Sequence, residues 1–119
     1  MTALIENNLD YHAAKHAQKI VTNGADENTI TRALGVLQEN GVYACFLYLI
    51  ANKDHIIVPQ MIEFLEAIGL PKPPASNKPD DVLGYVAEQI TTSLPNLLLA
   101  RETLEQMLIY ARYAAKAQD

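Results

Sequence analysis

Residues 94–117, LPNLLLARETLEQMLIYARYAAKA, carry a helical periodicity from one end to the other. Apolar residues recur every three or four positions, the spacing that places side chains on one face of an α-helix. These positions are Leu97, Ala100, Leu104, Met107, Leu108, Ala111, Ala114 and Ala115. The pattern predicts a long amphipathic helix whose apolar face closes the core of the fold.

The other side of this predicted helix mixes charge with exposed apolar groups. At about 100° per residue, four charged residues fall on one narrow stripe. They are Arg101, Glu105, Arg112 and Lys116. Three apolar or aromatic residues lie beside the stripe instead of in the core, namely Leu98, Ile109 and Tyr113. We therefore expect this helix to offer apolar patches flanked by cations to a partner outside the fold.

Length and composition indicate one folded domain spanning residues 1–119. The chain is 50% hydrophobic, lacks tryptophan and has a single cysteine, Cys45, which excludes an internal disulfide and a multi-cysteine zinc site. Residues 1–10 have neither the basic segment nor the apolar segment of a signal peptide. No apolar run approaches the roughly 20 residues that cross a bilayer. We expect a soluble, cytoplasmic protein with no membrane role.

The distribution of charge limits the partners. A net charge of -5 argues against a nucleic-acid partner when taken alone. Residues 24–93 hold four Lys/Arg and nine Asp/Glu, which accounts for the whole deficit. The two terminal segments are therefore neutral overall, and any basic surface must be local.

Start and stop signals predict two helices in the first 40 residues. Asn8 suits the N-cap of the first, and Asn23-Gly24 ends it, because glycine supplies the left-handed residue after a helix. Asp26 or Asn28 begins the second, which ends at Asn40-Gly41. The first helix carries a second basic stripe opposite its apolar face. It consists of His12, Lys15, His16 and Lys19.

Residues 42–51, VYACFLYLIA, are apolar on all sides and fit either a buried strand or a central helix. We prefer a helix, because no partner strand appears elsewhere and a lone strand leaves its backbone groups unpaired.

The remaining residues predict a fourth helix, a connector and a fifth helix. Pro59 lies in the first turn of the fourth helix, and Gly69 ends it. Residues 70–79 hold four prolines and predict an extended connector. Pro79 starts a fifth helix that reaches about residue 90. Ser93 then begins the closing helix, so the fold class is all-α, a compact bundle of five or six helices.

No catalytic signature is present. The chain lacks a Gly-rich phosphate loop, a Gly-x-Ser-x-Gly elbow, Cys-x-x-Cys and His-Glu-x-x-His. His12 and His16 have the spacing of two metal ligands on one helix face, but no third ligand is nearby, and a solvated polar face explains them better. Cys45 lies in the most apolar segment, where a thiol is usually unreactive. We expect no enzymatic activity, no metal and no cofactor.

Three stretches resemble one known family. The closing helix contributes Ala100-Arg101-Glu102, Leu104, Leu108 and Arg112-Tyr113-Ala114. An earlier region contributes Ala33-Leu34-Gly35-Val36-Leu37, Asn40-Gly41-Val42, Ala44, Phe46-Leu47 and Lys53, and the N-terminal part adds Tyr11-x-x-Ala14 with the alanines and lysines up to Lys19. In this order and spacing they resemble the small helical subunit of type III-B CRISPR effector complexes, the Cmr small-subunit family.

The resemblance implies a non-catalytic subunit that stacks with copies of itself as an inner filament along guide RNA and target RNA, beside other effector-complex protein subunits. It assigns phosphate contacts to Arg101, Arg112 and Lys116, with Lys15 and Lys19 as further candidates. It assigns subunit contacts to Leu98, Ile109 and Tyr113. A second possibility stays open, in which the chain is a helical protein–protein adaptor or regulator that acts through its apolar patches and has no nucleic-acid role.

Overall fold

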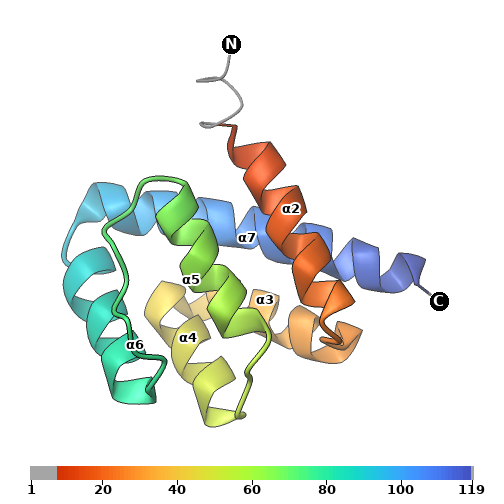
Figure 1. The fold of residues 1–119 in the computed structure, drawn as a ribbon, viewed down its shortest axis with the longest axis horizontal. Coiled ribbons are helices and arrows are strands. Elements are labelled where there is room, and N and C mark those ends of the chain that lie inside the picture. The colour runs from red at the N-terminus through yellow and green to blue at the C-terminus, as the bar shows by residue number, and fades with distance from the viewer. Residues whose placement is uncertain (1–7, 119) are drawn as a thin grey trace.

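The computed structural model describes residues 8–118, in which six α-helices and one π-helical segment follow one another without a strand (Figure 1). They are α2 (Leu9–Thr22), α3 (Glu27–Asn40), α4 (Val42–Ala51), α5 (Ile57–Ala67), α6 (Pro79–Tyr85), the π-helix η1 (Val86–Ile90) and α7 (Leu94–Ala117). The radius of gyration is 13.4 Å, close to the value of about 13.5 Å expected for a compact chain of this length. The predicted all-α bundle is confirmed.

Side-chain caps start the helices where the sequence predicts. Asn8 accepts a hydrogen bond from the Tyr11 amide at 3.1 Å, and Asp26 accepts one from the Thr29 amide at 2.8 Å. Ser93 caps α7 in the same way, through the amide of Asn96. Each cap satisfies a backbone donor that the first helical turn leaves free. Of the two N-caps proposed for α3, the structure selects Asp26.

Three helices end in the same hydrogen-bond motif, in which a left-handed residue follows the helix and two amides bond back to its last turn. In α2 the left-handed residue is Gly24, with φ of 102°, and in α5 it is Gly69, with φ of 98°. In α4 it is Lys53, with φ of 59°, whose amide bonds to Ile50 O at 2.9 Å. Lys53 is the one non-glycine residue with positive φ among residues 8–118.

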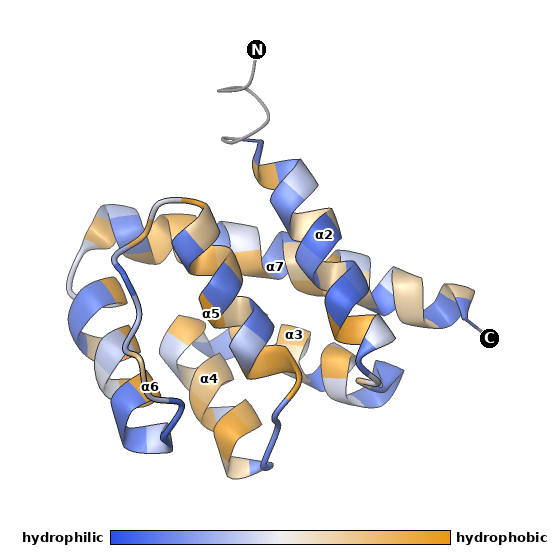
Figure 2. Ribbon diagram, viewed as in Figure 1, coloured by the Kyte–Doolittle hydropathy of each residue, from blue (hydrophilic) through white to orange (hydrophobic). Residues whose placement is uncertain are grey.

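The apolar segment 42–51 is helical, as predicted, and forms α4. One face of α4 is fully buried and supplies Val42, Cys45, Phe46 and Leu49 to the core. The opposite face is not buried, because Tyr43 and Leu47 are exposed. Most of α4 is nevertheless apolar in sequence, as its colouring in Figure 2 shows. The predicted helix is confirmed, and its central position applies to one face only.

The long helix α7 runs across most of the molecule and passes behind α5 and α2 in the view of Figure 1. It packs against α2, α3, α4 and η1. Its buried side chains are Ala100, Thr103, Leu104, Met107, Leu108, Ala111 and Ala115, with Leu97 half-buried beside them. The predicted core face of α7 is confirmed. This helix contacts both the first helix of the described chain, α2, and the segment that precedes it, η1.

The proline-rich connector has no regular structure between residues 70 and 78 and runs alongside α6 (Figure 1). The Tyr85 hydroxyl donates a hydrogen bond of 2.6 Å to the carbonyl oxygen of Pro71, which ties the connector to α6. The predicted fifth helix does span 79–90, but its second half is the π-helix η1. Within residues 8–118, no helix combines the length and the apolar character that crossing a membrane requires.

Candidate functional site

The predicted cations of α7 border α3, which runs antiparallel to α7. Near the C-terminal end of α3, Arg101 Nη2 donates a hydrogen bond of 2.9 Å to the carbonyl oxygen of Gln38. Near its N-terminal end, Lys116 Nζ lies 3.7 Å from Glu27 Oε2. The tertiary structure thus places Arg101 and Lys116 along one flank of the molecule, at the two ends of the α3–α7 contact.

Both contacts are weak enough to be exchanged for a ligand. The Lys116 and Glu27 side chains are 58% and 38% exposed, and theirs is the single ion pair within 4.0 Å among residues 8–118. Exposed pairs of this kind contribute about 0–1 kcal/mol. Arg101 is also exposed and bonds to a neutral carbonyl. An anion with the charge of a phosphate would compete with either partner.

Arg112, which lies between them on α7, is half-buried. Its Nε atom is buried and has no hydrogen-bond partner among residues 8–118, and its Cζ atom lies 5.5 Å from the centre of the Tyr113 ring. A buried donor left unpaired typically costs about 1–3 kcal/mol. Arg112 thus has one buried donor without a partner among residues 8–118, while the rest of its side chain is partly accessible.

The apolar part of the predicted surface divides into exposed and half-buried residues. Leu98 is 56% exposed and Tyr113 is 60% exposed, so both side chains are available to a partner. Leu94, which the sequence analysis did not single out, is 65% exposed. Ile109 is half-buried and packs on the core. Of the three residues predicted to contact a neighbouring subunit, Leu98 and Tyr113 are therefore accessible, whereas Ile109 packs partly against the core.

A shallow groove of ≈ 380 Å³ lies between α2 and α7 beside Tyr113. It is lined largely by small and apolar residues, including Ala14, Ala17, Val21 and Ala114. Small side chains leave this groove open because they do not fill the space between the two helices.

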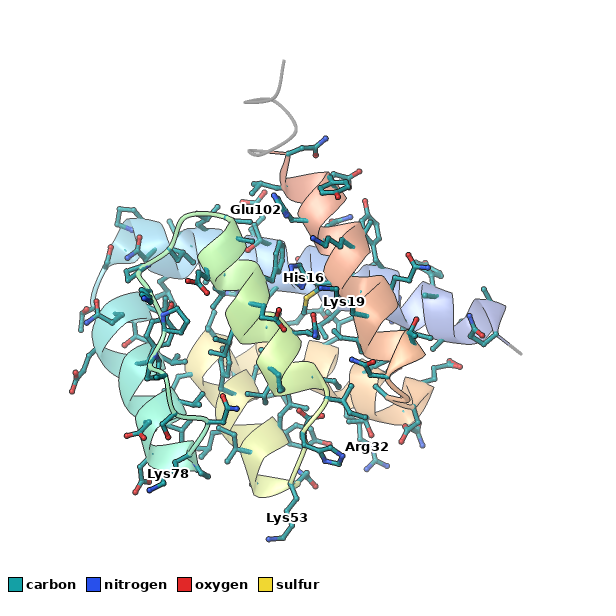
Figure 3. All side chains as sticks on the ribbon, in the orientation of Figure 1. His16, Lys19, Arg32, Lys53, Lys78 and Glu102 are labelled. Carbon is teal, nitrogen blue, oxygen red and sulfur yellow. The ribbon has the colours of Figure 1, made fainter. Side chains whose placement is uncertain are left out.

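The basic stripe predicted on α2 is only partly correct. Lys15 and Lys19 are exposed, but His16 is buried. Its Nδ1 atom lies 2.9 Å from Gln60 Oε1, and its ring centre lies 5.6 Å from that of Phe64 (Figure 3). Burial lowers the pKa of His16, with the nearby Lys19 acting in the same direction and the Gln60 hydrogen bond opposing both. The prediction of a solvated His16 was wrong because α5 and α7 both pack against α2, which widens its buried arc.

Lys15 and Lys19 belong to a different part of the surface from the α7 cations. They line a separate shallow hollow on α2 together with Gln18, Thr22 and Asn23. The structure thus brings Arg101 and Lys116 to one helix pair, and it places Lys15 and Lys19 on another element.

Cys45 is fully buried, and its thiol lies 3.5 Å from the carbonyl oxygen of Ala33. Burial raises the pKa of this thiol to about 12, with a smaller contribution in the same direction from Asp54. A thiolate is the nucleophilic form of cysteine, so Cys45 is poorly suited to nucleophilic chemistry.

One polar cleft was not anticipated from the sequence. It has a volume of ≈ 840 Å³ and lies where the turn between α2 and α3 faces the loop between α4 and α5. Arg32 and Lys53 line it, although neither belongs to a predicted basic stripe. They are 21 positions apart in the chain, so periodicity within one helix could not have grouped them.

Comparison of the chain with protein-family models, with curated proteins and with solved structures found no match.

Proposed function

We propose that this protein is a non-catalytic small subunit of a type III CRISPR RNA-guided effector complex. In this role it works in the cytoplasm, stacks with copies of itself beside other protein subunits, and contacts the backbones of guide RNA and target RNA. The proposal extends the family resemblance of residues 11–19, 33–53 and 100–114. The structural observation that carries it is the dual character of α7, which presents cations and large exposed apolar side chains on its outward side.

The cations support contact with a phosphate backbone. Arg101, Arg112 and Lys116 are spread over four helical turns of α7, so they can follow an extended anion instead of converging on a single point. Their intramolecular partners are a carbonyl oxygen, an aromatic ring and one exposed carboxylate. Guanidinium groups are well suited to replace such partners with phosphate oxygens. Lys15 and Lys19 are further, separate candidates on α2.

The apolar residues support contact with protein. Leu98 and Tyr113 are more than half exposed and lie near opposite ends of α7. Large exposed apolar groups at two separate places suit a subunit that meets one neighbour at each end, since such heterologous contacts build a linear stack.

The net charge of -5 is compatible with this role if several copies act together. Copies held in a row raise the effective concentration of each further RNA contact, so a weak single contact suffices. The isolated chain should consequently bind single-stranded RNA poorly. About three phosphate contacts would give a slope of roughly -2 in the logarithm of affinity against the logarithm of salt concentration.

The test uses the co-expressed complex and two sets of variants. Combined Arg101→Gln, Arg112→Gln and Lys116→Gln changes should lower RNA retention and leave the subunit composition unchanged in native mass spectrometry. Leu98→Asp with Tyr113→Asp should instead reduce the number of copies of this chain. Lys72→Gln with Lys78→Gln removes exposed charge from the connector side and serves as the matched control.

The second candidate function is a helical protein–protein adaptor or regulator without a nucleic-acid role. The acidic net charge and the exposure of Leu94, Leu98 and Tyr113 favour it. This alternative replaces our proposal if RNA retention survives the three α7 charge changes while Tyr113→Asp still disrupts assembly. The proposal would also be overturned if this chain were absent from the RNA-guided complex purified after co-expression with the other proposed subunits.

A further inference from the structure

The cleft between the α2–α3 turn and the α4–α5 loop is large and polar. Its volume of ≈ 840 Å³ falls within the range of about 300–1,000 Å³ typical of small-ligand sites. The first turn of α3 forms one side, and the end of α4 with the following loop forms the other. Arg32 lies in the second turn of α3 and Lys53 in the loop after α4. Figure 3 shows both at the same end of the molecule, with Lys53 extending away from the bundle.

The carboxylates at this cleft are already held by the protein. Asp26 accepts hydrogen bonds from the amide and the hydroxyl of Thr29, at 2.8 and 3.1 Å. Asp54 accepts from the amides of Ile57 and Val58, at 3.0 and 2.7 Å. Glu27 faces Lys116 at 3.7 Å. The acidic groups therefore serve as helix caps and as an ion-pair partner.

Unlike these carboxylates, the two cations that line the cleft have no ion-pair partner in the described part of the chain. Arg32 and Lys53 are exposed, and neither has an ion-pair partner within 4.0 Å among residues 8–118. Asp26 and Asp54 occupy amides at the starts of α3 and α5, so the cationic donors left for an anion in this cleft are the Arg32 and Lys53 side chains. The cleft is thus lined by two cations that have no ion-pair partner among residues 8–118. It is also lined by three carboxylates, each of which has a hydrogen-bond or ion-pair partner and keeps its negative charge.

The backbone of Lys53 gives a second, independent reason to assign a role to its side chain. It occupies a left-handed position, with φ of 59°, at a helix end where the two equivalent ends of this chain have Gly24 and Gly69. Glycine adopts that conformation without steric strain, whereas a residue with a Cβ does not. The chain thus keeps lysine at the cleft where glycine would suit the backbone better.

We propose that this cleft binds a nucleoside phosphate, with Arg32 and Lys53 holding the phosphate group. Arginine provides paired donors for phosphate oxygens and lysine a mobile positive charge. Tyr48 and Asn28 also line the cleft and supply an aromatic surface and an amide for the nucleoside part. The ligand is either a free nucleotide or one unit of an RNA strand, which share this chemistry. The inference concerns the single chain and does not rest on the proposed function.

The test measures binding to the full-length chain by isothermal titration calorimetry and NMR shifts at low salt. The probes are uridine monophosphate, inorganic phosphate and a short single-stranded oligouridine. Lys53→Gly and Arg32→Gln should each weaken binding by about tenfold, the effect of losing roughly one charge-assisted hydrogen bond. Lys78→Gln, which removes an exposed lysine that does not line the cleft, should leave binding unchanged.

Each outcome decides the matter. Binding of the mononucleotide with loss in both variants identifies a free-nucleotide site, and binding of the oligomer alone with the same loss identifies a contact to RNA. The proposal is overturned if the unmodified chain binds none of the probes, if Lys53→Gly and Arg32→Gln bind normally, or if Lys78→Gln weakens binding equally. Because Lys53→Gly relieves backbone strain, unfolding does not explain a loss in that variant. Arg101→Gln with Arg112→Gln, which leaves the Lys116–Glu27 pair at the cleft intact, should retain this binding and so separates it from the effector-complex role.

Discussion

The imidazole of His16 donates a hydrogen bond of 2.9 Å from Nδ1 to the side-chain oxygen of Gln60, 44 positions further along the chain. The Gln60 amide nitrogen donates in turn to Glu63 Oε2 at 3.1 Å, which orients the Gln60 oxygen toward the histidine. Since that oxygen only accepts, His16 carries its proton on Nδ1. A buried polar pair therefore links α2 to α5.

This pair makes stability depend on pH. Burial lowers the pKa of His16 below 6.5, so the unfolded chain binds a proton more readily than the folded one. The contribution of neutral, buried His16 to the free energy of unfolding is complete above the pKa that this histidine has in the unfolded chain. It is lost as pH falls through the lower pKa of His16 in the folded protein. We expect the free energy of unfolding in urea to decrease from pH 7.5 toward pH 5.

The matched control for this effect is His55, which is exposed. His55→Asn should keep the pH dependence, and His16→Asn should reduce it while also lowering stability at neutral pH. An unchanged pH profile in His16→Asn would show that another group is responsible.

Lys53→Gly should raise the free energy of unfolding by about 0.5–1 kcal/mol, because glycine accepts the left-handed conformation without strain. The gain is limited by the loss of a cation near the end of the α4 dipole. Gly69→Ala provides the reverse test at the equivalent end of α5 and should lower stability by a similar amount. Urea titration measures both, and a destabilised Lys53→Gly variant would contradict the strain assigned to this position.

The Cys45 thiol should not react with a disulfide reagent at pH 8 while the protein is folded. Burial raises its pKa to about 12, so little thiolate forms and the reagent cannot reach it. Absorbance should show one reacting thiol only after denaturant is added. Reaction of the native chain at the rate of a free peptide thiol would mean that the core around α4 opens readily.

Tyr85→Phe should loosen the connector and have a modest effect on overall stability. The change removes the 2.6 Å hydrogen bond to the Pro71 carbonyl but keeps the buried aromatic ring. We expect a loss of about 0.5–1.5 kcal/mol. Limited proteolysis should show faster cleavage within residues 70–78. Tyr43→Phe, on the exposed face of α4, is the control that should change neither quantity.

Helix positions were largely predictable because the signals for them are local. Each of the N-caps Asn8, Asp26 and Ser93 accepts a hydrogen bond from an amide three residues later. Gly24 and Gly69 each bond back to the last turn of the helix that they end. These residues mark boundaries wherever the helices finally pack. The π-helical turn at residues 86–90 was not predictable in this way, because its amino acids fit an ordinary helix equally well.

The candidate site was predictable only within one helix. The periodicity of residues 94–117 correctly separated the buried face of α7 from Leu98 and Tyr113. It could not show that Ile109 packs partly on the core, or that Arg101 would meet Gln38. Those facts depend on which neighbouring helix covers each side of α7.

The order of residues alone decides the helical class, most helix boundaries and the amphipathic nature of the closing helix, because caps, glycines and apolar spacing act over one or two turns. The folded bundle decides the burial of His16 and the placement of Arg32 and Lys53 on the lining of one cleft. Both depend on packing between segments 21 to 44 positions apart. The side chains that make these contacts are far apart in the chain, so a pattern within one or two helical turns cannot predict that they will meet.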